Sequence, residues 1–241
     1  MRIAVLSDIH SNLAALEAVR DDMSTVDEVW VLGDIVGYGP QPIEVIRTLQ
    51  AMGARSVLGN HDGAAIGTVD PSDFNPDAAR AIAWTAEAID DNARAYLASL
   101  PEVRCDGDLT AVHGSPRDPI WEYITSPEIA APNFEAFKTP ICLFGHTHVP
   151  IVFRLESGGD VEIVPANVGE PVALDARRCL VNPGSVGQPR DGHPASSYIV
   201  LDGDTGQVEF RRVPYDLERT QRLIRDAGLP PRLAERLAYG R

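Results

Sequence analysis

The amino-acid sequence predicts an α/β protein. Apolar runs of strand length alternate with helix-like segments in the first half of the chain, which is the pattern of βαβ units. Short strands separated by turns rich in Gly and Asp follow in the second half. The length of 241 residues and a hydrophobic content of 44% suit one large domain with a sizeable core. We therefore expect a single domain over residues 1–241.

Three strands and two helices are expected before residue 59. In the first helix, apolar residues recur at helical spacing, and Ser11 or Asn12 can cap its start. The strands are 3–6, 29–32 and 54–58, and the helices are about 12–23 and 42–52.

The middle of the chain combines an insertion with two further strands. Residues 63–73 are loop-like and residues 76–100 are Ala-rich, so 63–100 is expected to be a helical insertion. The sequence leaves open whether this insertion shapes a substrate site or covers a sheet face. Strands are expected at 109–112 and 141–144, and the Pro-rich segment 115–138 between them is expected to form an irregular loop. Arg117, Trp121 and Tyr123 on this loop are candidates for substrate contact.

Two hairpins and a helical tail are expected in the last third of the chain. The hairpins pair strands 149–155 with 161–164 and 197–201 with 207–213, and they predict a second, more antiparallel sheet. The tail from Asp216 is expected to be helical in two pieces, broken at residues 228–231.

The composition excludes several classes of function. A net charge of −14 argues against non-specific nucleic-acid binding, which requires clustered Lys and Arg. No apolar run approaches the ~20 residues of a membrane span. We expect no membrane partner, and we expect a cytoplasmic location because no secretory signal is recognised. The three cysteines are widely spaced and are expected to be reduced.

Polar residues gather directly after the expected strands. Five of the six histidines follow such apolar runs, and only His193, expected to be exposed on a loop, does not. Because neighbouring strands place their carboxyl ends along one edge, where open α/β sheets bind ligands, these residues are expected to converge. The set consists of Asp8, His10, Asp34, Asn60, His61, Asp62, His113, His146 and His148.

The side chains of this set suit metal ions. Carboxylate and amide oxygens and imidazole nitrogens, without thiolates, bind borderline divalent metals. A single zinc site needs only three or four protein ligands. The larger number of candidates here favours two ions roughly 3.5–4 Å apart with one carboxylate between them.

The order of these motifs resembles the signature of the calcineurin-like metallophosphoesterase superfamily. The signature blocks are Asp-x-His at 8–10, Gly-Asp at 33–34, Gly-Asn-His-Asp at 59–62, a later His113, and Gly-His-Thr-His at 145–148. The run at 182–190 resembles bacterial members of the phosphodiesterase-like branch. The resemblance implies a four-layer αββα sandwich with two mixed β-sheets.

The resemblance also implies roles for seven metal ligands. Asp34 bridges two divalent ions, and a metal-bound hydroxide attacks phosphorus. Mn²⁺ is the expected metal, with Fe, Zn²⁺, Co²⁺ and Ni²⁺ as alternatives. One ion is held by Asp8, His10 and His148, and the other by Asn60, His113 and His146.

Three further residues are candidates for catalysis or substrate binding. His61 matches the general acid of the family, since a histidine with a pKa of ~6.5 can protonate a leaving alkoxide, and Asp62 is a possible partner that orients it. Asn12 lies at a helix N-terminus, where backbone amides can receive a phosphate. Capping that helix is its other expected task.

One departure from the family pattern limits the substrate assignment. Protein Ser/Thr phosphatases and symmetrical dinucleoside tetraphosphatases carry Gly-Asp-x-Val-Asp-Arg-Gly, whereas residues 33–39 here read Gly-Asp-Ile-Val-Gly-Tyr-Gly. The missing Arg clamps phosphate and the missing Asp supports the catalytic His in those enzymes. Arg190 can supply a replacement bidentate contact. A surface salt bridge is the alternative role for Arg190.

These patterns predict a metal-dependent phosphoesterase that hydrolyses phosphodiester or nucleotide-type phosphoanhydride bonds. Its partner would be a small phosphorylated substrate, for which a nucleotide is one candidate, and the oligomeric state is left open. Phosphomonoesterase or protein phosphatase activity is the alternative within enzymes. A metal-free interaction scaffold is the alternative from another class, but such members lose ligands, and here every ligand position is filled.

Overall fold

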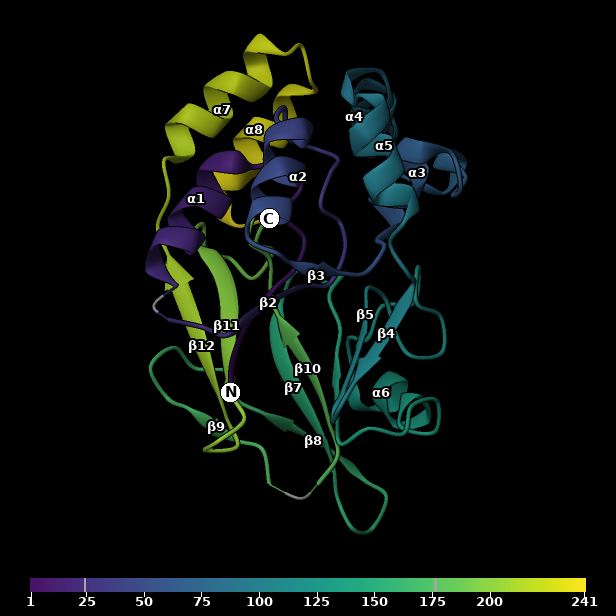
Figure 1. The fold of residues 1–241 in the computed structure, drawn as a ribbon, viewed down its shortest axis with the longest axis vertical. Helices are drawn as coiled ribbons and strands as arrows, with labels where there is room; N and C mark the ends of the chain where they lie inside the picture. Colours follow the sequence, from purple (N-terminus) through teal and green to yellow (C-terminus); the bar gives the residue numbers. More distant parts are fainter. Residues whose placement is uncertain (24, 176) are drawn as a thin grey trace.

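Two six-stranded sheets pack face to face in the computed structural model, which describes residues 1–23, 25–175 and 177–241 (Figure 1). Helices cover the outer face of each sheet, so the molecule has the four αββα layers and the two mixed sheets that were predicted.

The first sheet has the strand order β3-β2-β1-β11-β12-β9. β1, β2 and β3 are parallel to one another, whereas β11, β12 and β9 are added in antiparallel fashion. The strands are β1 (Arg2–Leu6), β2 (Glu28–Val31), β3 (Arg55–Ser56), β9 (Val172–Ala173), β11 (Ser196–Asp202) and β12 (Gln207–Val213).

The second sheet has the order β4-β5-β6-β10-β7-β8. Here β5, β6 and β10 are parallel, and β4, β7 and β8 are antiparallel to their neighbours. The strands are β4 (Val103–Asp106), β5 (Leu109–Val112), β6 (Ile141–Leu143), β7 (Pro150–Leu155), β8 (Val161–Val164) and β10 (Cys179–Pro183).

The two predicted hairpins form, but the expectation that they build a separate second sheet is wrong. β11 pairs with β1, and Ile199 lies opposite Val5, so the hairpin β11-β12 extends the first sheet. The hairpin β7-β8 instead joins β10 in the second sheet. Hairpin formation is local and readable from turn residues, whereas the edge that a hairpin joins depends on distant strands. β4, β9 and β10 were not predicted as strands.

The core between the sheets consists of side chains on their facing sides. It includes Val5 and Trp30 from the first sheet and Leu143 and Val181 from the second, all buried. Alternate residues of the same strands, such as Leu6, point to the helices instead. Burial on both faces explains why these strands are nearly continuous apolar runs.

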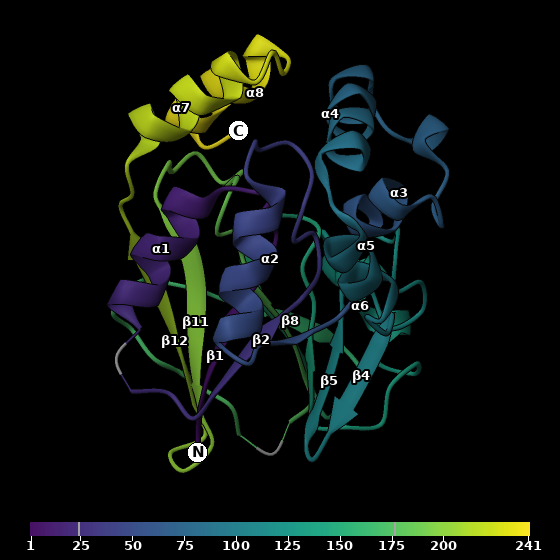
Figure 2. The same ribbon diagram turned by 45° about the horizontal axis from the view of Figure 1, so that its top comes forward.

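Helices cover both outer faces and one end of the sandwich. α1 and α2 pack on the first sheet, and α6 packs on the second. Figure 2 shows α7 and α8 above α1, at the same end of the molecule as α4. The helices are α1 (Leu13–Asp22), α2 (Pro42–Ala51), α3 (Asn60–Ile66), α4 (Pro76–Ala88), α5 (Asp91–Ala98), α6 (Pro127–Asn133), α7 (Leu217–Asp226) and α8 (Pro231–Glu235), with short 3₁₀ turns η1 (Pro71–Asp73) and η2 (Arg236–Tyr239). In the described part of the chain, none of these helices has the length and apolar character to cross a bilayer.

The segment 63–100 is helical, but the loop expected at 63–73 is partly wrong. α3 begins at Asn60 because the Asp62 carboxylate accepts a hydrogen bond from Gly59 N at 3.1 Å, which caps the helix. The sequence left two roles for this segment, and the structure shows that part of it covers a sheet face. Leu97 of α5 packs into the core under the first sheet, whereas Ala81 of α4 packs beside Tyr38 and the C-terminal helices.

The packing of β11 generates a stability prediction. Ile199 is fully buried between the sheets, whereas Ile163 on β8 is 48% exposed. Ile199→Ala should lower the free energy of unfolding by ~2–5 kcal/mol because it removes buried methyl groups and leaves a cavity. Ile163→Ala deletes the same atoms at the surface and should change it by less than about 0.5 kcal/mol. Urea unfolding followed by circular dichroism measures both, and equal losses would contradict the assigned core.

Candidate metal centre

The seven predicted metal ligands meet at one end of the sandwich, on loops that follow parallel strands of both sheets. β1 and β2 of the first sheet lead to three of them, and β5 and β6 of the second sheet lead to three more. Asn60 is the first residue of α3, after β3. The sequence anticipated one shared edge, and the structure forms it from two sheets.

Four side chains form a first cluster, in which one donor atom of each lies within 4.8 Å of the others. Nε2 of His148 lies 3.2 Å from Oδ1 of Asp8 and 3.3 Å from Nε2 of His10. The Nε2 atom of His10 lies 3.6 Å from Oδ2 of Asp34. All four side chains are buried.

A second cluster shares the Asp34 carboxylate with the first. Oδ2 of Asp34 lies 3.4 Å from Nε2 of His113, which in turn lies 3.0 Å from Nδ1 of His146 and 3.1 Å from Oδ1 of Asn60. The same carboxylate oxygen therefore faces both groups of donors. This is the arrangement expected of a bridging ligand.

The orientation of the imidazoles fits divalent cations. Nδ1 of His10, His113 and His148 lies 3.1, 2.8 and 2.6 Å from a backbone carbonyl oxygen. A carbonyl oxygen only accepts, so each Nδ1 donates its proton, and in the neutral rings of His10 and His148 the Nε2 atom then presents a lone pair to the cluster. The lone pairs thus face one another, and Oδ1 of Asp8 is buried without a hydrogen-bond partner. A cation satisfies all of these acceptors at once.

The separations between donors agree with shared coordination. Two ligand atoms bound to one ion at about 2.0–2.2 Å lie roughly 2.8–3.6 Å apart in octahedral or tetrahedral geometry. The His148–Asp8 and His113–His146 contacts fall in this range. The residues present therefore fit a dinuclear site.

Burial controls the protonation of the cluster. It lowers the pKa of His146 to about 2, and it lowers the pKa values of His10 and His148 well below the usual range. These rings stay neutral at pH 7, as metal ligands must. At His113, burial also lowers the pKa, but the Asp34 carboxylate outweighs it and raises the pKa to about 9. Metal binding displaces such a proton.

Five of the seven ligands have a left-handed backbone conformation that residues other than glycine rarely adopt. Their φ angles are between 50° and 64°. The conformation turns each side chain toward the centre immediately after a strand ends. The five residues are Asp8, His10, Asp34, His146 and His148.

Hydrogen bonds between the loops hold this backbone in place. Asp8 N donates to Gly33 O at 3.1 Å, and His10 N donates to Asp34 O at 2.9 Å. Gly59 allows the third loop to approach, because a Cβ there would overlap the backbone nitrogen and carboxylate of Asp34. Loops from different strands therefore form one rigid unit.

Polar side chains behind the ligands fix their orientation, and sequence reasoning missed most of them. Ser7 Oγ donates to Oδ2 of Asp8 at 2.6 Å, which leaves Oδ1 to face the cluster. Ser185 Oγ donates to Asp8 O at 2.8 Å, and Asn182 Nδ2 donates to Gly145 O at 2.7 Å. Asn182 and Ser185 belong to the 182–190 motif, so this motif holds the loops that carry the ligands in position.

His61 lies beside the metal cluster and lines a cavity of about 160 Å³ with its ligands. Its ring centroid is 4.8 Å from His10, 4.4 Å from Tyr38 and 4.9 Å from Phe74. A Cβ at Gly37 would lie 2.5 Å from its Nδ1, so glycine at that position makes room for the ring. Burial lowers the pKa of His61 to about 4, although Asp34 opposes the shift.

Asp62 does not contact the His61 ring through a hydrogen bond, which corrects the expectation that it orients the ring. Its Oδ1 accepts from Val36 N at 2.9 Å and its Oδ2 accepts from Gly59 N at 3.1 Å. Burial raises its pKa to about 7. The carboxyl group joins the loop after β2 to the start of α3 and so acts on the backbone that carries Asn60 and His61.

Asn12 caps α1 and is not among the described residues that line the metal cavity, which corrects its expected contact with phosphate. Its Oδ1 accepts from Ala15 N at 3.2 Å and from Thr220 Oγ1 at 2.9 Å, and its Nδ2 donates to Gly187 O at 3.0 Å. These bonds tie α1 to α7 and to the loop after β10.

The remaining wall of the cavity includes some of the candidates for substrate contact and adds another residue. Arg190 lines it, and its guanidinium group bonds Gln188 Oε1 at 2.9 Å. Trp121 and Tyr123 also line it, and the Tyr123 ring lies 3.8 Å from that of His146. Arg117 is not among the lining residues described. No sequence pattern indicated Arg236, which reaches the cavity from η2.

Comparison with known proteins identifies relatives of the whole chain. Residues 1–206 match the profile of the calcineurin-like phosphoesterase superfamily domain. A crystal structure of a metallophosphoesterase from Sphaerobacter thermophilus is 48% identical, has a TM-score of 0.92, and is matched over 100% of this chain and 99% of that chain. An uncharacterized protein of Methanocaldococcus jannaschii is 37% identical over 99% of this chain and 98% of its own length.

A similarity over a shorter segment links the chain to a nucleotide-hydrolysing enzyme. The symmetrical bis(5'-nucleosyl)-tetraphosphatase of Erwinia tasmaniensis is 37% identical over 67 residues. That match covers 26% of this chain and 24% of the tetraphosphatase.

The two clusters generate a metal-binding prediction. Purified protein loaded with Mn²⁺ should hold about two ions per chain, and His10→Ala and His113→Ala should each lose about one. Removing the ions with a chelator should lower the melting temperature, because the ions bind only the folded site. His193→Ala, in an exposed loop, is the matched control and should keep both ions. Mass spectrometry measures the number of metal ions bound per chain. Fewer than about one ion per chain in the native protein would contradict the dinuclear site.

Proposed function

This chain belongs to the calcineurin-like phosphoesterase superfamily, and we propose that it hydrolyses phosphodiester or nucleotide-type phosphoanhydride bonds with two divalent metal ions. One observation carries the proposal: two buried donor clusters share the Asp34 carboxylate and open into a cavity that also holds His61. Ligands of both clusters and the His61 ring therefore line one common space.

The residues that hold the ions are those predicted from the sequence. When bound, the two ions lower the pKa of water and stabilise the charge that develops on the attacking and leaving oxygens. Oxygen and imidazole donors suit Mn²⁺, which we propose as the metal, and they also suit Fe, Zn²⁺, Co²⁺ and Ni²⁺. The ligand set is Asp8, His10 and His148 for one ion, Asn60, His113 and His146 for the other, and Asp34 for both.

Arg190 binds the substrate phosphoryl group in this proposal. Its guanidinium group lies 5.9 Å from the Tyr38 ring centroid, and Tyr38 occupies the position where related phosphatases carry Arg. No Asp or Glu side chain of the described residues forms an ion pair with Arg190. Its charge is therefore available to an anionic ligand, for which the planar fork of donors is suited.

His61 supplies the proton to the leaving oxygen in this proposal. Burial holds its pKa near 4 in the free site, so the ring is neutral before the substrate arrives. A phosphoryl group adds negative charge beside the ring and raises its pKa, as the Asp34 carboxylate already does. Once protonated, the ring acts as a general acid.

The alternatives differ in substrate or in class. The chain is locally similar to a symmetrical bis(5'-nucleosyl)-tetraphosphatase, but those enzymes also carry the Asp-Arg pair that is missing here, so this similarity supports a phosphoesterase without favouring phosphoanhydrides. A phosphomonoesterase or protein phosphatase has less support, because Gly37 and Tyr38 stand where those enzymes carry Asp and Arg. A metal-free scaffold has least support, since the two clusters retain buried lone pairs that no protein group satisfies.

Substrate preference tests the proposal. With Mn²⁺, we expect a higher kcat/KM for bis(4-nitrophenyl) phosphate than for 4-nitrophenyl phosphate, because a diester carries less negative charge and this chain has Tyr38 where protein phosphatases carry Arg. Asp34→Asn should abolish both activities, since it weakens the ligand shared by the two ions. Release of 4-nitrophenolate measures the rates. A higher kcat/KM for the monoester would contradict the proposed diester preference. If the metal-loaded protein hydrolysed neither substrate, the proposal that it is a phosphoesterase would be wrong.

The proton donor generates a second prediction. His61→Ala should retain both metal ions yet slow hydrolysis of an alkyl phosphodiester by ~10²–10⁴-fold. A 4-nitrophenyl ester should be slowed less, because its leaving oxygen needs no proton. Comparing the two substrates separates a proton donor from a structural residue, which would slow both equally. Loss of metal in this variant would instead make His61 a ligand.

A further inference from the structure

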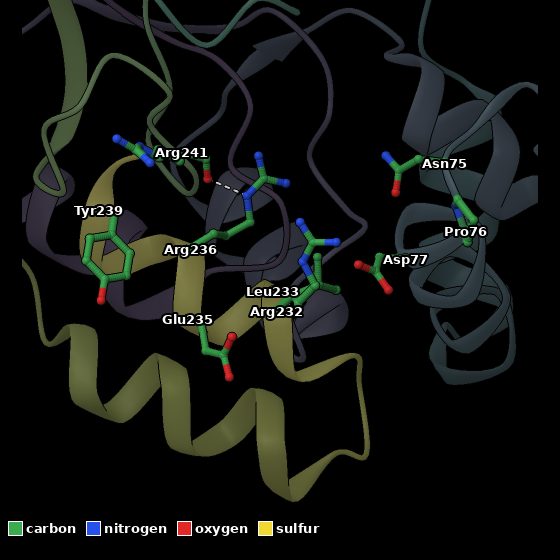
Figure 3. A pocket seen from close by; sticks show the side chains of 9 residues that line it. All are labelled: Asn75, Pro76, Asp77, Arg232, Leu233, Glu235, Arg236, Tyr239 and Arg241. Atoms are coloured by element: carbon green, nitrogen blue, oxygen red, sulfur yellow. Dashed lines mark hydrogen bonds between the residues drawn. The ribbon is translucent and has the colours of Figure 1, made fainter.

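A second, larger cavity adjoins the metal centre. It has a volume of about 650 Å³ and lies between the N-terminus of α4 and the C-terminal segment α8-η2 (Figure 3). Asn75 and Arg236 line both this cavity and the metal cavity. The two spaces are therefore neighbours, with the Arg236 side chain between them.

The small volume of the metal cavity implies that a substrate extends beyond it. The metal cavity, at about 160 Å³, is smaller than the ~300–1,000 Å³ of typical ligand pockets. It accommodates a phosphoryl group but not the rest of a nucleotide-sized molecule. The adjoining cavity falls within the typical range, so it is the natural place for the remainder of the substrate.

The positive charges around the adjoining cavity indicate that the part of the substrate bound there is anionic. The chain has a net charge of −14, yet it brings together the guanidinium groups of Arg190, Arg232 and Arg236. Burial lowers the pKa of Arg236, and Arg190 and Arg232 lower it further by repulsion. Among the described residues, no Asp or Glu side chain forms an ion pair with any of the three. A bound anion would relieve this repulsion.

The acidic side chains of the cavity do not neutralise the arginines. Figure 3 shows Glu235 pointing away from Arg232 and Arg236, while Asp77 lies across the opening from Arg232. Arg232 affects Arg236 more strongly than Asp77 does. The one interaction drawn for Arg236 is its Nε donating to the backbone oxygen of Arg241, which leaves its terminal nitrogens for a ligand.

We propose that Arg232 and Arg236 bind a second phosphate group of the substrate, at a distance from the phosphate that is hydrolysed. This rests on the proposed function and narrows the substrate class to compounds with at least two phosphates, such as phosphorylated nucleotides. Both arginines lie beyond residue 206, where the match to the family domain ends. The C-terminal segment thus acts as a specificity element that the shared domain does not contain.

Binding of a matched pair of nucleotides tests this inference. Calorimetry on the Mn²⁺-loaded protein should show that thymidine 3',5'-bisphosphate binds roughly 10–100-fold more tightly than thymidine 5'-monophosphate, the gain expected from charge-assisted hydrogen bonds. Arg232→Ala and Arg236→Ala should each reduce this ratio by about tenfold or bring it to one. Arg225→Ala removes the same charge from an exposed position on α7 outside both cavities, and it should leave the ratio unchanged.

The outcomes separate this inference from the proposed function. A ratio near one in the native protein, or an equal loss in all three variants, would overturn the second phosphate site. Circular dichroism melts of each variant show whether it is folded. If Arg236→Ala does not fold, Arg232→Ala still tests the site, because Arg232 is exposed. Hydrolysis of thymidine 5'-(4-nitrophenyl phosphate) is followed separately. Bisphosphate preference without hydrolysis would support the site and reject the phosphoesterase activity.

Discussion

The metal centre depends on a strained backbone that the two sheets hold in place. Five ligands lie in the left-handed region, a conformation that costs ~1–3 kcal/mol for each residue when it is enforced. The cost is tolerated because the loops hydrogen-bond to one another: Val186 N donates to Ser7 O at 3.0 Å and Gly145 N donates to His113 O at 2.8 Å. The first of these bonds joins the loops of the two sheets, so it requires both sheets to end at the same level. Burial between the sheets therefore supports the geometry of the ligands as well as the stability of the fold.

Electrostatics makes the same centre unfavourable without cations. Burial raises the pKa of Asp8 to about 7 and lowers that of His146 to about 2, so the protein environment opposes charge on both. Asp34 and His113 attract each other, which raises the pKa of His113 to about 9, but the neutral rings of His10, His146 and His148 gain nothing from one another. They gain from a divalent ion, which binds all of them and cancels the burial penalty of the carboxylates. The arrangement of ligands that is unfavourable without cations is therefore the one that favours metal binding.

The sequence predicted which polar side chains meet, because each of them follows a strand, and strand ends are local features. It also predicted the four layers, through the resemblance carried by the same motifs. It failed where distant segments meet. Nothing near Arg236 indicates that η2 folds back to the cavity, and nothing at Asp62 shows that its carboxylate is used by Val36 N and not by the neighbouring ring. β10 was missed because it merges with the 182–190 motif, whose polar residues obscure the strand.

The replacement of Asp-Arg by Gly37 and Tyr38 explains how the substrate side of the cavity is built. Glycine leaves space for the His61 ring, and the Tyr38 ring packs against His10 and His61 at 4.7 and 4.4 Å. Tyrosine carries no charge, so cations for an anionic substrate must come from elsewhere. Arg190 and Arg236 lie 5.9 and 6.0 Å from that same ring. One arginine follows β10 and the other belongs to the C-terminal segment, so the cationic groups beside the cavity come from parts of the chain that carry none of the donor residues of the two clusters.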